Sequence, residues 1–251
     1  MPSYDFRSPR LFVEAPLGQG AEVRLNAAQA HYLGAVLRLK SGGRVLVFNG
    51  RDGEWEGSLA AAKRVALVRV AEQTRAQSAA TDLYYLFAPL KAARLDYMVQ
   101  KAVEMGVSRL SAVLTRHSQV ARVNIERMRA NAIEAAEQCG VLSLPKVDEP
   151  VALSRLLAEW DPVRRLIFCD EDAETSDPIA AFSGLPRSPL AVLIGPEGGF
   201  AEDERAALLK LPNVVRLSLG PRILRADTAA VAALTLVQAV LGDWCPAAAQ
   251  P

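Results

Sequence analysis

Two glycine-containing segments near the carboxyl end of the chain carry the residue types that could hold a small ligand. Residues 193–200 read LIGPEGGF, and residues 217–230 read LSLGPRILRADTAA. Glycine tolerates positive φ and lets the backbone approach a ligand closely, so such loops can present N–H and C=O groups to a flat molecule. Each segment follows an apolar run that predicts a buried strand, and ligands of α/β sheets bind beyond the carboxyl ends of strands.

The glycine spacing restricts the class of ligand. The dinucleotide pattern G-x-G-x-x-G is absent, and no Lys-Ser or Lys-Thr pair follows the glycines as in a phosphate-binding P-loop. The apolar residues around both segments are Leu193, Leu219, Ile223 and Leu224. The segments therefore predict a ligand held by main-chain groups and apolar walls, such as an adenosine without phosphates. The alternative for a single such loop is a tight connection between a strand and a helix.

An alternation of strands and helices from residue 82 onward would position these segments. Strands are predicted at Leu83–Ala88, Leu110–Thr115, Leu166–Cys169, Leu190–Ile194 and Val214–Leu217. Helices are predicted at Leu95–Met105, Ile125–Gln138, Val151–Trp160, Glu202–Lys210 and Asp227–Leu241. Pro150 at a first helical position and the acidic run 202–204 in a first turn agree with helix-start preferences. The pattern predicts an α/β fold with a mostly parallel sheet between two layers of helices.

Residues 1–72 predict a small barrel-like β module, because short apolar runs alternate with glycine-rich turns. The segment NGRDGEW at 49–55 is a hairpin signal, and one helix is expected over residues 26–39 with Asn26 as its N-cap. The polar, small-residue-rich segment 73–81 is the predicted linker. The second domain is then 82–245, followed by a tail at 246–251.

The composition is that of a soluble globular protein, with 51% hydrophobic and 23% charged residues and no apolar run long enough for a membrane span. The start of the chain has no secretory h-region. The three scattered cysteines form no CxxC pair, and there are only two histidines. These features argue against disulfides and metal and fit a reducing cytoplasm. Residues 1–75 hold 11 Lys/Arg against 7 Asp/Glu, a weak indication of a polyanionic partner.

The last predicted helix has almost no polar face apart from Thr235 and Gln238. A helix that is apolar nearly all round is buried. A second subunit could cover it, which predicts a dimer; the alternative is a core helix covered within one chain.

The motifs LIGPEGGFAEDE at 193–204 and LSLGPRILRADTAAVAALTLVQAVLGDW at 217–244 closely resemble the signatures of the bacterial small-subunit ribosomal RNA uridine-N3 methyltransferases. This RsmE-like family belongs to the SPOUT superfamily. KAARLDYMVQKAVEMGVSRL at 91–110 and AAEQCG at 135–140 resemble further motifs of the family. SPRLFVEAP at 8–16 and residues 31–55 resemble its PUA-like RNA-binding module. The resemblance spans nearly the whole chain.

The resemblance implies a PUA-like β-barrel domain followed by a methyltransferase domain tied in a deep trefoil knot. S-adenosylmethionine would bind, bent, among the knot loops of a homodimer, and the partner would be ribosomal RNA or the small ribosomal subunit. Carried over residue by residue, the cofactor pocket would use Gly195, Glu197, Gly198, Gly199, Ser218, Leu219, Gly220, Ile223, Leu224 and Thr228. The segment Phe168–Glu171 would close the adenosine side.

Two positions depart from the family pattern. Asp227 stands where the family usually has Glu, which puts the reach of that carboxylate in doubt. Val141 stands where an Arg commonly follows the EQCG motif, which suggests that one RNA contact is lost or supplied elsewhere.

Methylation of uracil N3 would need a base and a cation near the developing imidate charge. Arg225 is the candidate cation, and either Glu197 or Asp227 is the candidate base. The alternatives are that Glu197 caps the helix near Ala201, that Asp227 caps the last helix, and that Arg225 binds phosphate. His117 is left without a role. No metal is required.

Basic residues in both parts of the chain form a candidate RNA surface, because guanidinium and ammonium groups suit phosphate contacts. The set comprises Arg7, Arg10, Arg38, Lys40, Arg44, Arg51, Lys91, Arg94 and Lys101. Each of them alone could equally be a solvated surface charge.

Two other functions are competing hypotheses. The first is a SPOUT methyltransferase that acts on transfer RNA. The second is a non-catalytic RNA-binding protein of ribosome assembly, whose glycine loops would be damaged, whereas both loops here are complete.

Overall fold

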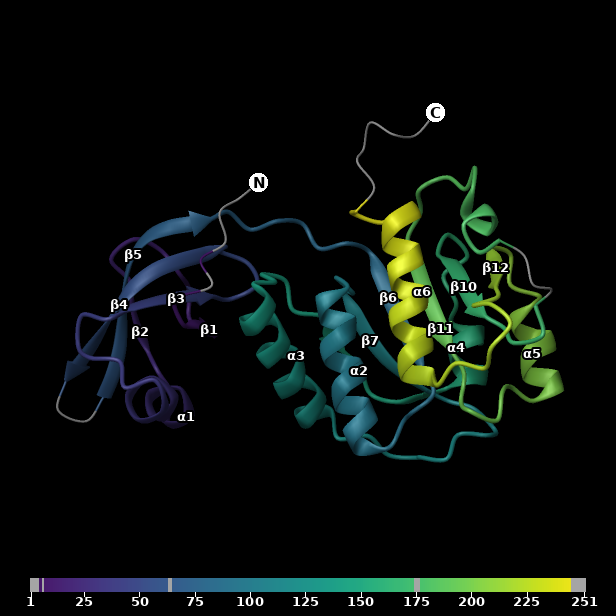
Figure 1. The fold of residues 1–251 in the computed structure, drawn as a ribbon, viewed down its shortest axis with the longest axis horizontal. Coiled ribbons are helices and arrows are strands. Elements are labelled where there is room, and N and C mark those ends of the chain that lie inside the picture. The colour runs from purple at the N-terminus through teal and green to yellow at the C-terminus, as the bar shows by residue number, and fades with distance from the viewer. Residues whose placement is uncertain (1–4, 6, 63–64, 174–176, 245–251) are drawn as a thin grey trace. The chain divides into compact units, whose positions relative to one another are not determined.

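The computed structural model describes residues 5, 7–62, 65–173 and 177–244, and the expected alternation after residue 82 forms a seven-stranded sheet (Figure 1). Its strands are β6 (Leu83–Phe87), β7 (Arg109–Leu114), β8 (Lys146–Val147), β9 (Val151–Ala152), β10 (Arg165–Cys169), β11 (Leu190–Ile194) and β12 (Val214–Leu217). Their order is β12-β10-β11-β6-β7-β8, β9 also pairs with β7, and every pair is parallel. The predicted tail 246–251 and Cys245 lie outside the described residues.

Helices cover both faces of this sheet. They are α2 (Ala92–Glu104), α4 (Leu153–Ala158), α5 (Glu202–Leu208) and α6 (Ala226–Val240), with a 3₁₀ turn at Ala180–Phe182. A further helix, α3 (Ile125–Cys139), begins in this part of the chain. Helices α2 and α6 pack on each other, and α6 also packs on β11. On the other face, Leu153 of α4 and Leu208 of α5 join Ala191 and Leu193 of β11 in one core cluster. Successive strand residues point to opposite faces, so β11, which is buried along its whole length, serves both layers. The α/β prediction is confirmed.

The strand order brings three loops to one edge of the sheet. Strand β10 lies between β11 and β12, so the chain passes from β11 to the far side of β10 before α6 returns to β11. The segments that follow these three neighbouring parallel strands therefore converge at their carboxyl ends. The trefoil knot stays a prediction from the resemblance.

The predicted helix Val151–Trp160 is wrong at its start. Val151 and Ala152 form β9, whose register pairs Val151 with Val113 of β7, and α4 begins only at Leu153. Pro150 therefore precedes a strand and is not in a first helical turn. Strands β8 and β9 have two residues each, too few to show an alternating pattern in the sequence.

The amino-terminal part contains a curled five-stranded sheet (Figure 1). Its strands are β1 (Arg10–Phe12), β2 (Glu22–Arg24), β3 (Arg44–Phe48), β4 (Glu54–Ala62) and β5 (Val65–Arg75), in the order β1-β3-β4-β5-β2. The β3–β4 hairpin is confirmed, and Gly50 and Gly53 have the positive φ angles, 81° and 79°, that its turn requires. The predicted helix is present as α1 (Ala27–His31) followed by a π-helix at Tyr32–Val36. Asn26 caps it, in a capping box with Gln29.

The chain divides into two compact units, and the first takes residues from two places in the sequence. It comprises residues up to Ala79 together with Ile133–Leu144, and the second comprises Ala80–Ala132 and the residues from Pro145 onward. Strand β5 runs to Arg75, so it enters the predicted linker at 73–81.

The segment 133–144 joins the first unit through specific hydrogen bonds. The Phe12 amide donates to the Glu137 carboxylate at 2.8 Å, the Arg10 guanidinium donates to the Glu137 carbonyl at 3.2 Å, and Arg75 donates to the Gly140 carbonyl at 2.9 Å. These partners are 65 to 127 residues apart in the sequence. Local sequence patterns therefore did not predict that residues 133–144 belong to the first unit. Within the described part of the chain, none of the helices has the length and apolar character to cross a bilayer.

Candidate functional site

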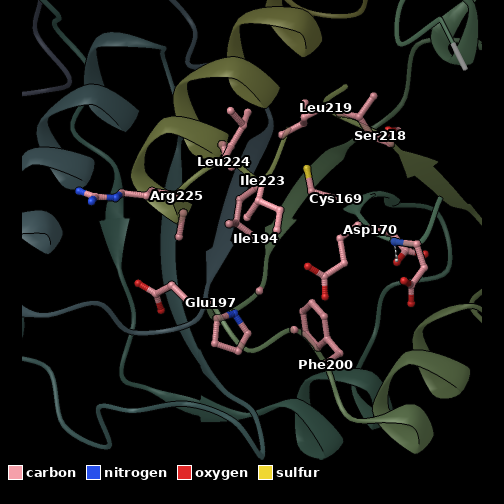
Figure 2. Close-up of a pocket in the computed structure, with 18 of the residues that line it drawn as sticks. Cys169, Asp170, Ile194, Glu197, Phe200, Ser218, Leu219, Ile223, Leu224 and Arg225 are labelled. Atoms are coloured by element: carbon pink, nitrogen blue, oxygen red, sulfur yellow. Dashed lines mark hydrogen bonds between the residues drawn. The ribbon is translucent and has the colours of Figure 1, made fainter. Parts of the chain in front are cut away.

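A cavity of about 410 Å³ lies at the carboxyl ends of β10, β11 and β12 (Figure 2). That volume is in the range of small-molecule sites. Three segments line it, residues 169–172 at the end of β10, 194–197 with 199 and 200 at the end of β11, and 217–226 at the end of β12. Arg205 of α5 and Ala229 of α6 complete the wall. The two glycine segments therefore meet at one cavity, as their positions after neighbouring strands suggested.

The first glycine loop makes a tight turn beside an aromatic ring. The Gly199 amide donates to the Pro196 carbonyl at 2.9 Å, and Gly199 has φ of 67°, a conformation that favours glycine. Gly195 lies directly against the Phe200 ring, since a Cβ at position 195 would be 2.5 Å from a ring carbon. Phe200 packs edge-to-face on Phe168, with ring centroids 5.2 Å apart. Glycine is thus required at both positions for the loop to keep this shape.

The second glycine loop supplies apolar wall and leads into α6. Gly220 has φ of 95°, Ser218 is buried, and Leu224 is half-buried. Ile223 is 95% exposed although it borders the cavity, so nearly the whole residue is open to solvent. Figure 2 shows Ile194, Ile223 and Leu224 grouped around the cavity. The cavity is thus lined by main-chain groups of two tight loops and by aliphatic side chains.

A buried carboxylate at the end of β10 fixes the third segment. Asp170 is 4% exposed and accepts hydrogen bonds from Arg205 of α5 at 3.0 Å and from Arg216 of β12 at 2.8 Å. Burial alone would raise the pKa of Asp170, but the two arginines outweigh it and lower that pKa below its ordinary value. Asp170 thus joins β10, α5 and β12 around the cavity.

Cys169, next to Asp170, lines the cavity as a neutral thiol. Burial raises its pKa to about 12, and the negative charge of Asp170 adds to the effect. Because a thiolate is the reactive form of cysteine, Cys169 is an inert wall residue.

Most of the predicted cofactor residues line the cavity, and two do not. The lining residues are Gly195, Glu197, Gly199, Ser218, Leu219, Gly220, Ile223 and Leu224. Gly198 and Thr228 are absent from its wall: Gly198 lies against His117, and Thr228 lies in the first turn of α6. Of the segment Phe168–Glu171, all but Phe168 line the cavity.

The structure separates the three catalytic candidates. Glu197 and Arg225 line the cavity, and Figure 2 shows both side chains extending from its rim. Glu197 forms an ion pair with Arg94 of α2 at 3.3 Å. Asp227 is not part of the wall, and its carboxylate accepts the Thr228 amide at 3.0 Å within α6.

The two capping alternatives for these carboxylates are wrong. The N-cap of α5 is Ala201, whose amide donates to Glu204 and not to Glu197. The N-cap of α6 is Arg225, not Asp227, which lies inside the first turn.

The predicted RNA residues lie in both units. Arg10 must be removed from the set, because its side chain is only 3% exposed and pairs with Glu54 at 2.6 Å. An arginine buried in such a pair is unavailable to phosphate. The exposed members of the first unit are Arg7, Arg38, Lys40, Arg44 and Arg51, and those of the second unit are Lys91 and the half-exposed Arg94 and Lys101. Several are already paired, Arg44 with Asp5 and Glu56 and Lys101 with Glu104.

Sequence reasoning missed the arginines that shape the cavity. Neither Arg205 nor Arg216 was proposed, although Asp170 belongs to a segment that was singled out. The sequence does contain a usable signal. Asp170 directly follows an apolar strand, so its carboxylate is expected to be buried, and a buried carboxylate needs a cationic partner. Among the described residues, no group of His, Cys, Asp and Glu could hold a metal ion.

The chain matches two family models. An RNA methyltransferase domain covers residues 77–238, and an RNA methyltransferase PUA domain covers residues 25–68. The Ribosomal RNA small subunit methyltransferase E of Rickettsia conorii is 30% identical over 239 residues, which are 94% of this chain and 97% of that protein. The protein of the same name from Bacillus subtilis is 25% identical and covers 91% of this chain and 95% of its own length.

Solved structures share the fold. A methyltransferase from Legionella pneumophila in complex with S-adenosylmethionine is 29% identical, with a TM-score of 0.81 over 94% of this chain and 99% of that one. A Ribosomal RNA small subunit methyltransferase E from Neisseria gonorrhoeae, at 24% identity, has a TM-score of 0.83 over 95% of this chain and all of its own.

Proposed function

Because the chain belongs to the RNA methyltransferase family that includes the small-subunit methyltransferases E, we propose that it methylates N3 of a uridine in 16S ribosomal RNA with S-adenosylmethionine as methyl donor. The observation that carries the proposal is the cavity between the two glycine loops at the ends of β11 and β12. The target uridine must be unpaired or flipped, because N3 takes part in Watson–Crick pairing.

The residues of the cavity fit this cofactor. Apolar walls from Ile194, Leu219 and Leu224 suit an adenine ring, and the glycine loops offer main-chain polar groups in place of a phosphate cradle. Gly195 and Gly199 let the loop pack tightly on its own side chains, because a Cβ at either position would lie 2.5 Å from the Phe200 ring or from the Glu171 carboxylate respectively. The bound cofactor would supply a methyl group on a sulfonium, an already activated donor that needs no metal.

We assign the two catalytic roles to Glu197 and Arg225. Glu197 would accept the N3 proton, since it is exposed at the rim, whereas Asp227 faces away into the first turn of α6. Arg225 would stand near a uracil oxygen and stabilise the negative charge that develops as the proton leaves. The Arg94–Glu197 ion pair would orient the carboxylate until the base enters.

RNA would bind along the exposed basic residues of both units. Phosphate contacts release counterions, so affinity should fall steeply with salt, and removal of several of these charges should flatten that dependence. The set is Arg7, Arg38, Lys40, Arg44, Arg51, Lys91, Arg94 and Lys101. We place the activity in the cytoplasm, as expected for a ribosome-modifying protein.

We also propose that the chain acts as a homodimer through its second unit. In α6, Leu236 and Val240 are only partly buried in the single chain, and Ile223 just before α6 is 95% exposed. An aliphatic side chain with that exposure at a functional cavity suits a contact with a second subunit.

The test is nucleoside analysis after incubation of small-subunit RNA with the protein and labelled S-adenosylmethionine. We expect label in N3-methyluridine, and Glu197→Gln should lower the rate about 100-fold, the lower range for a general base. Glu202→Gln, a change of an exposed carboxylate in α5 outside the cavity, is the matched control. Label in a ribose-methylated nucleoside or a guanine would refute the assignment.

A further inference from the structure

A turn at the carboxyl end of β7 holds the first glycine loop from outside the cavity. In this turn the Ser118 amide donates to the Thr115 carbonyl at 3.1 Å, and the Thr115 amide donates to the Ser118 hydroxyl at 2.9 Å. Between them, the Arg116 amide donates to the Glu204 carboxylate at 2.9 Å. The turn is therefore fixed both internally and to the first turn of α5.

His117 lies at the tip of this turn, and its imidazole contacts the two glycines that follow Glu197. The Nδ1 atom is 3.1 Å from the Gly198 carbonyl oxygen and 3.2 Å from the Gly199 carbonyl oxygen. A carbonyl can only accept, so Nδ1 must carry the hydrogen, and the neutral ring is held in the Nδ1–H tautomer. The Nε2 atom has no hydrogen-bond partner within the part of the chain that the structure describes.

The His117 side chain also packs against Gly198. A Cβ at position 198 would lie 3.6 Å from the His117 Cβ and 4.0 Å from its Nδ1, so the imidazole lies alongside the bare glycine backbone. Gly199 is bounded on its other side by the Glu171 carboxylate, whose oxygen would be 2.5 Å from a Cβ there. Residues from the ends of β7 and β10 thus enclose the Gly198–Gly199 peptide between them.

We propose that His117 is a positioning residue for the methyl donor, acting through the Gly198–Gly199 peptide. Its Nδ1–H orients both carbonyls outward, which fixes the shape that Pro196, Glu197 and Gly199 present to the cavity. This inference rests on the proposed function, since it assumes that the cavity binds S-adenosylmethionine. The other contact of the turn with α5, the Arg116–Asp203 pair, has side chains that are 60% and 64% exposed and contributes little. The histidine is therefore the main constraint on the loop from this side.

The test is calorimetric titration of S-adenosylmethionine into the full chain and three variants, His117→Ala, His117→Asn and His31→Ala. The alanine variant at 117 should bind about tenfold more weakly, the effect of one lost hydrogen bond. Asparagine can place an amide N–H near the position of Nδ1, so His117→Asn should keep affinity within about threefold of the wild type. His31, the other histidine of the chain, is exposed in the first unit, and its replacement should change nothing.

A spectroscopic readout separates positioning from simple packing. With only two histidines, a long-range ¹H–¹⁵N spectrum should show one ring, absent from His117→Ala, in the Nδ1–H form. Equal affinity of wild type and His117→Ala, an asparagine variant as weak as the alanine variant, or an Nε2–H ring would overturn the role of His117. Failure of the wild-type chain itself to bind the cofactor would instead overturn the proposed function.

Discussion

Each unit of the molecule contains a buried carboxylate held by two arginines, and the two clusters differ in what surrounds the arginines. In the first unit Glu54 accepts from Arg10 and Arg75, both at 2.6 Å. The three side chains are 3%, 3% and 11% exposed, so the whole cluster is away from water. The hydrogen bonds described for it join residues of the first unit, and we expect the cluster to serve stability.

In the second unit Asp170 is equally buried, at 3% of its side chain, but Arg205 and Arg216 are 29% and 36% exposed. Arg205 also lines the cavity. The same chemistry therefore fixes a closed core in one unit and the wall of an open cavity in the other. Exposure of the cations, not of the carboxylate, distinguishes the two cases.

The largest effect should come from Glu54→Gln. The change leaves Arg10 buried without a counter-charge, and breaking a buried pair in this way costs about 3–5 kcal/mol. Urea unfolding followed by circular dichroism measures the loss. Glu56→Gln, which removes a partner of the exposed Arg44, is the control and should cost less than about 1 kcal/mol. Equal losses of unfolding free energy in Glu54→Gln and Glu56→Gln would contradict the view that the buried Glu54 cluster stabilises the first unit.

Asp170→Asn should act on the ligand more than on the fold. Its arginines can turn toward water, so the loss in unfolding free energy should be smaller than for Glu54→Gln, while the cavity wall loosens. We expect S-adenosylmethionine affinity to fall about tenfold, measured by calorimetry, the equivalent of about 1.4 kcal/mol. Asp203→Asn is the matched control, because Asp203 is exposed, pairs with Arg116 and lies outside the cavity wall. Unchanged affinity in Asp170→Asn would show that the cluster serves only stability.

Glycine replacements sharpen the account of the cavity itself. Gly199→Ala combines positive φ with a Cβ 2.5 Å from Glu171, whereas Gly220→Ala has only the unfavourable φ and open space around it. Strain at positive φ costs about 1 kcal/mol or more and favours other loop conformations in the free protein. Because binding must restore the original conformation, both variants should bind the cofactor at least about fivefold more weakly. Gly199→Ala should be the weaker binder in the same titration. If Gly220→Ala were the weaker binder, the Glu171 side chain would have to move away from the new Cβ at little cost.

The smallest effect is expected at Glu137. Its pKa is shifted in the opposite direction from that of Glu54 in the same unit. Burial raises the pKa of Glu137, although the Phe12 amide opposes this, whereas the arginines hold the pKa of Glu54 below its ordinary value. A raised carboxyl pKa means that stability increases as pH falls through it, and a lowered one means that stability is lost there. Glu137→Gln, which keeps an oxygen for the Phe12 amide, should leave stability at pH 7 unchanged or a few tenths of a kcal/mol higher. A loss above about 1 kcal/mol would contradict the direction of that shift.

Local signals made much of the fold predictable from the sequence. The capping box of Asn26 and the turn glycines Gly50 and Gly53 depend on neighbours a few residues away. Strands β11 and β12 have the bounds that their apolar runs indicated, because each ends where a glycine loop begins. The same loops identified the cavity, since neighbouring parallel strands bring their ends together.

Non-local pairing explains what the sequence did not reveal. Arg10 was assigned to the RNA surface as a basic residue suited to phosphate. Its burial could not be seen in the sequence, because its partner Glu54 is 44 residues away. The Asp170 cluster needed partners 35 and 46 residues away, on two further elements. Thr228 was assigned to the cavity because it lies within the family motif at 217–244, yet it lies in the first turn of α6 and is not part of the wall.

The central claim is that the cavity between the two glycine loops carries out methyl transfer to ribosomal RNA. Mass mapping of 16S ribosomal RNA from cells that lack the protein, supplied with wild type or with Glu197→Gln at equal level, tests it most directly. We expect the wild type to restore one methyl group on the base of a single uridine, and the variant to leave that uridine unmethylated. Equal methylation by both forms, or no difference between cells with and without the protein, would contradict the account.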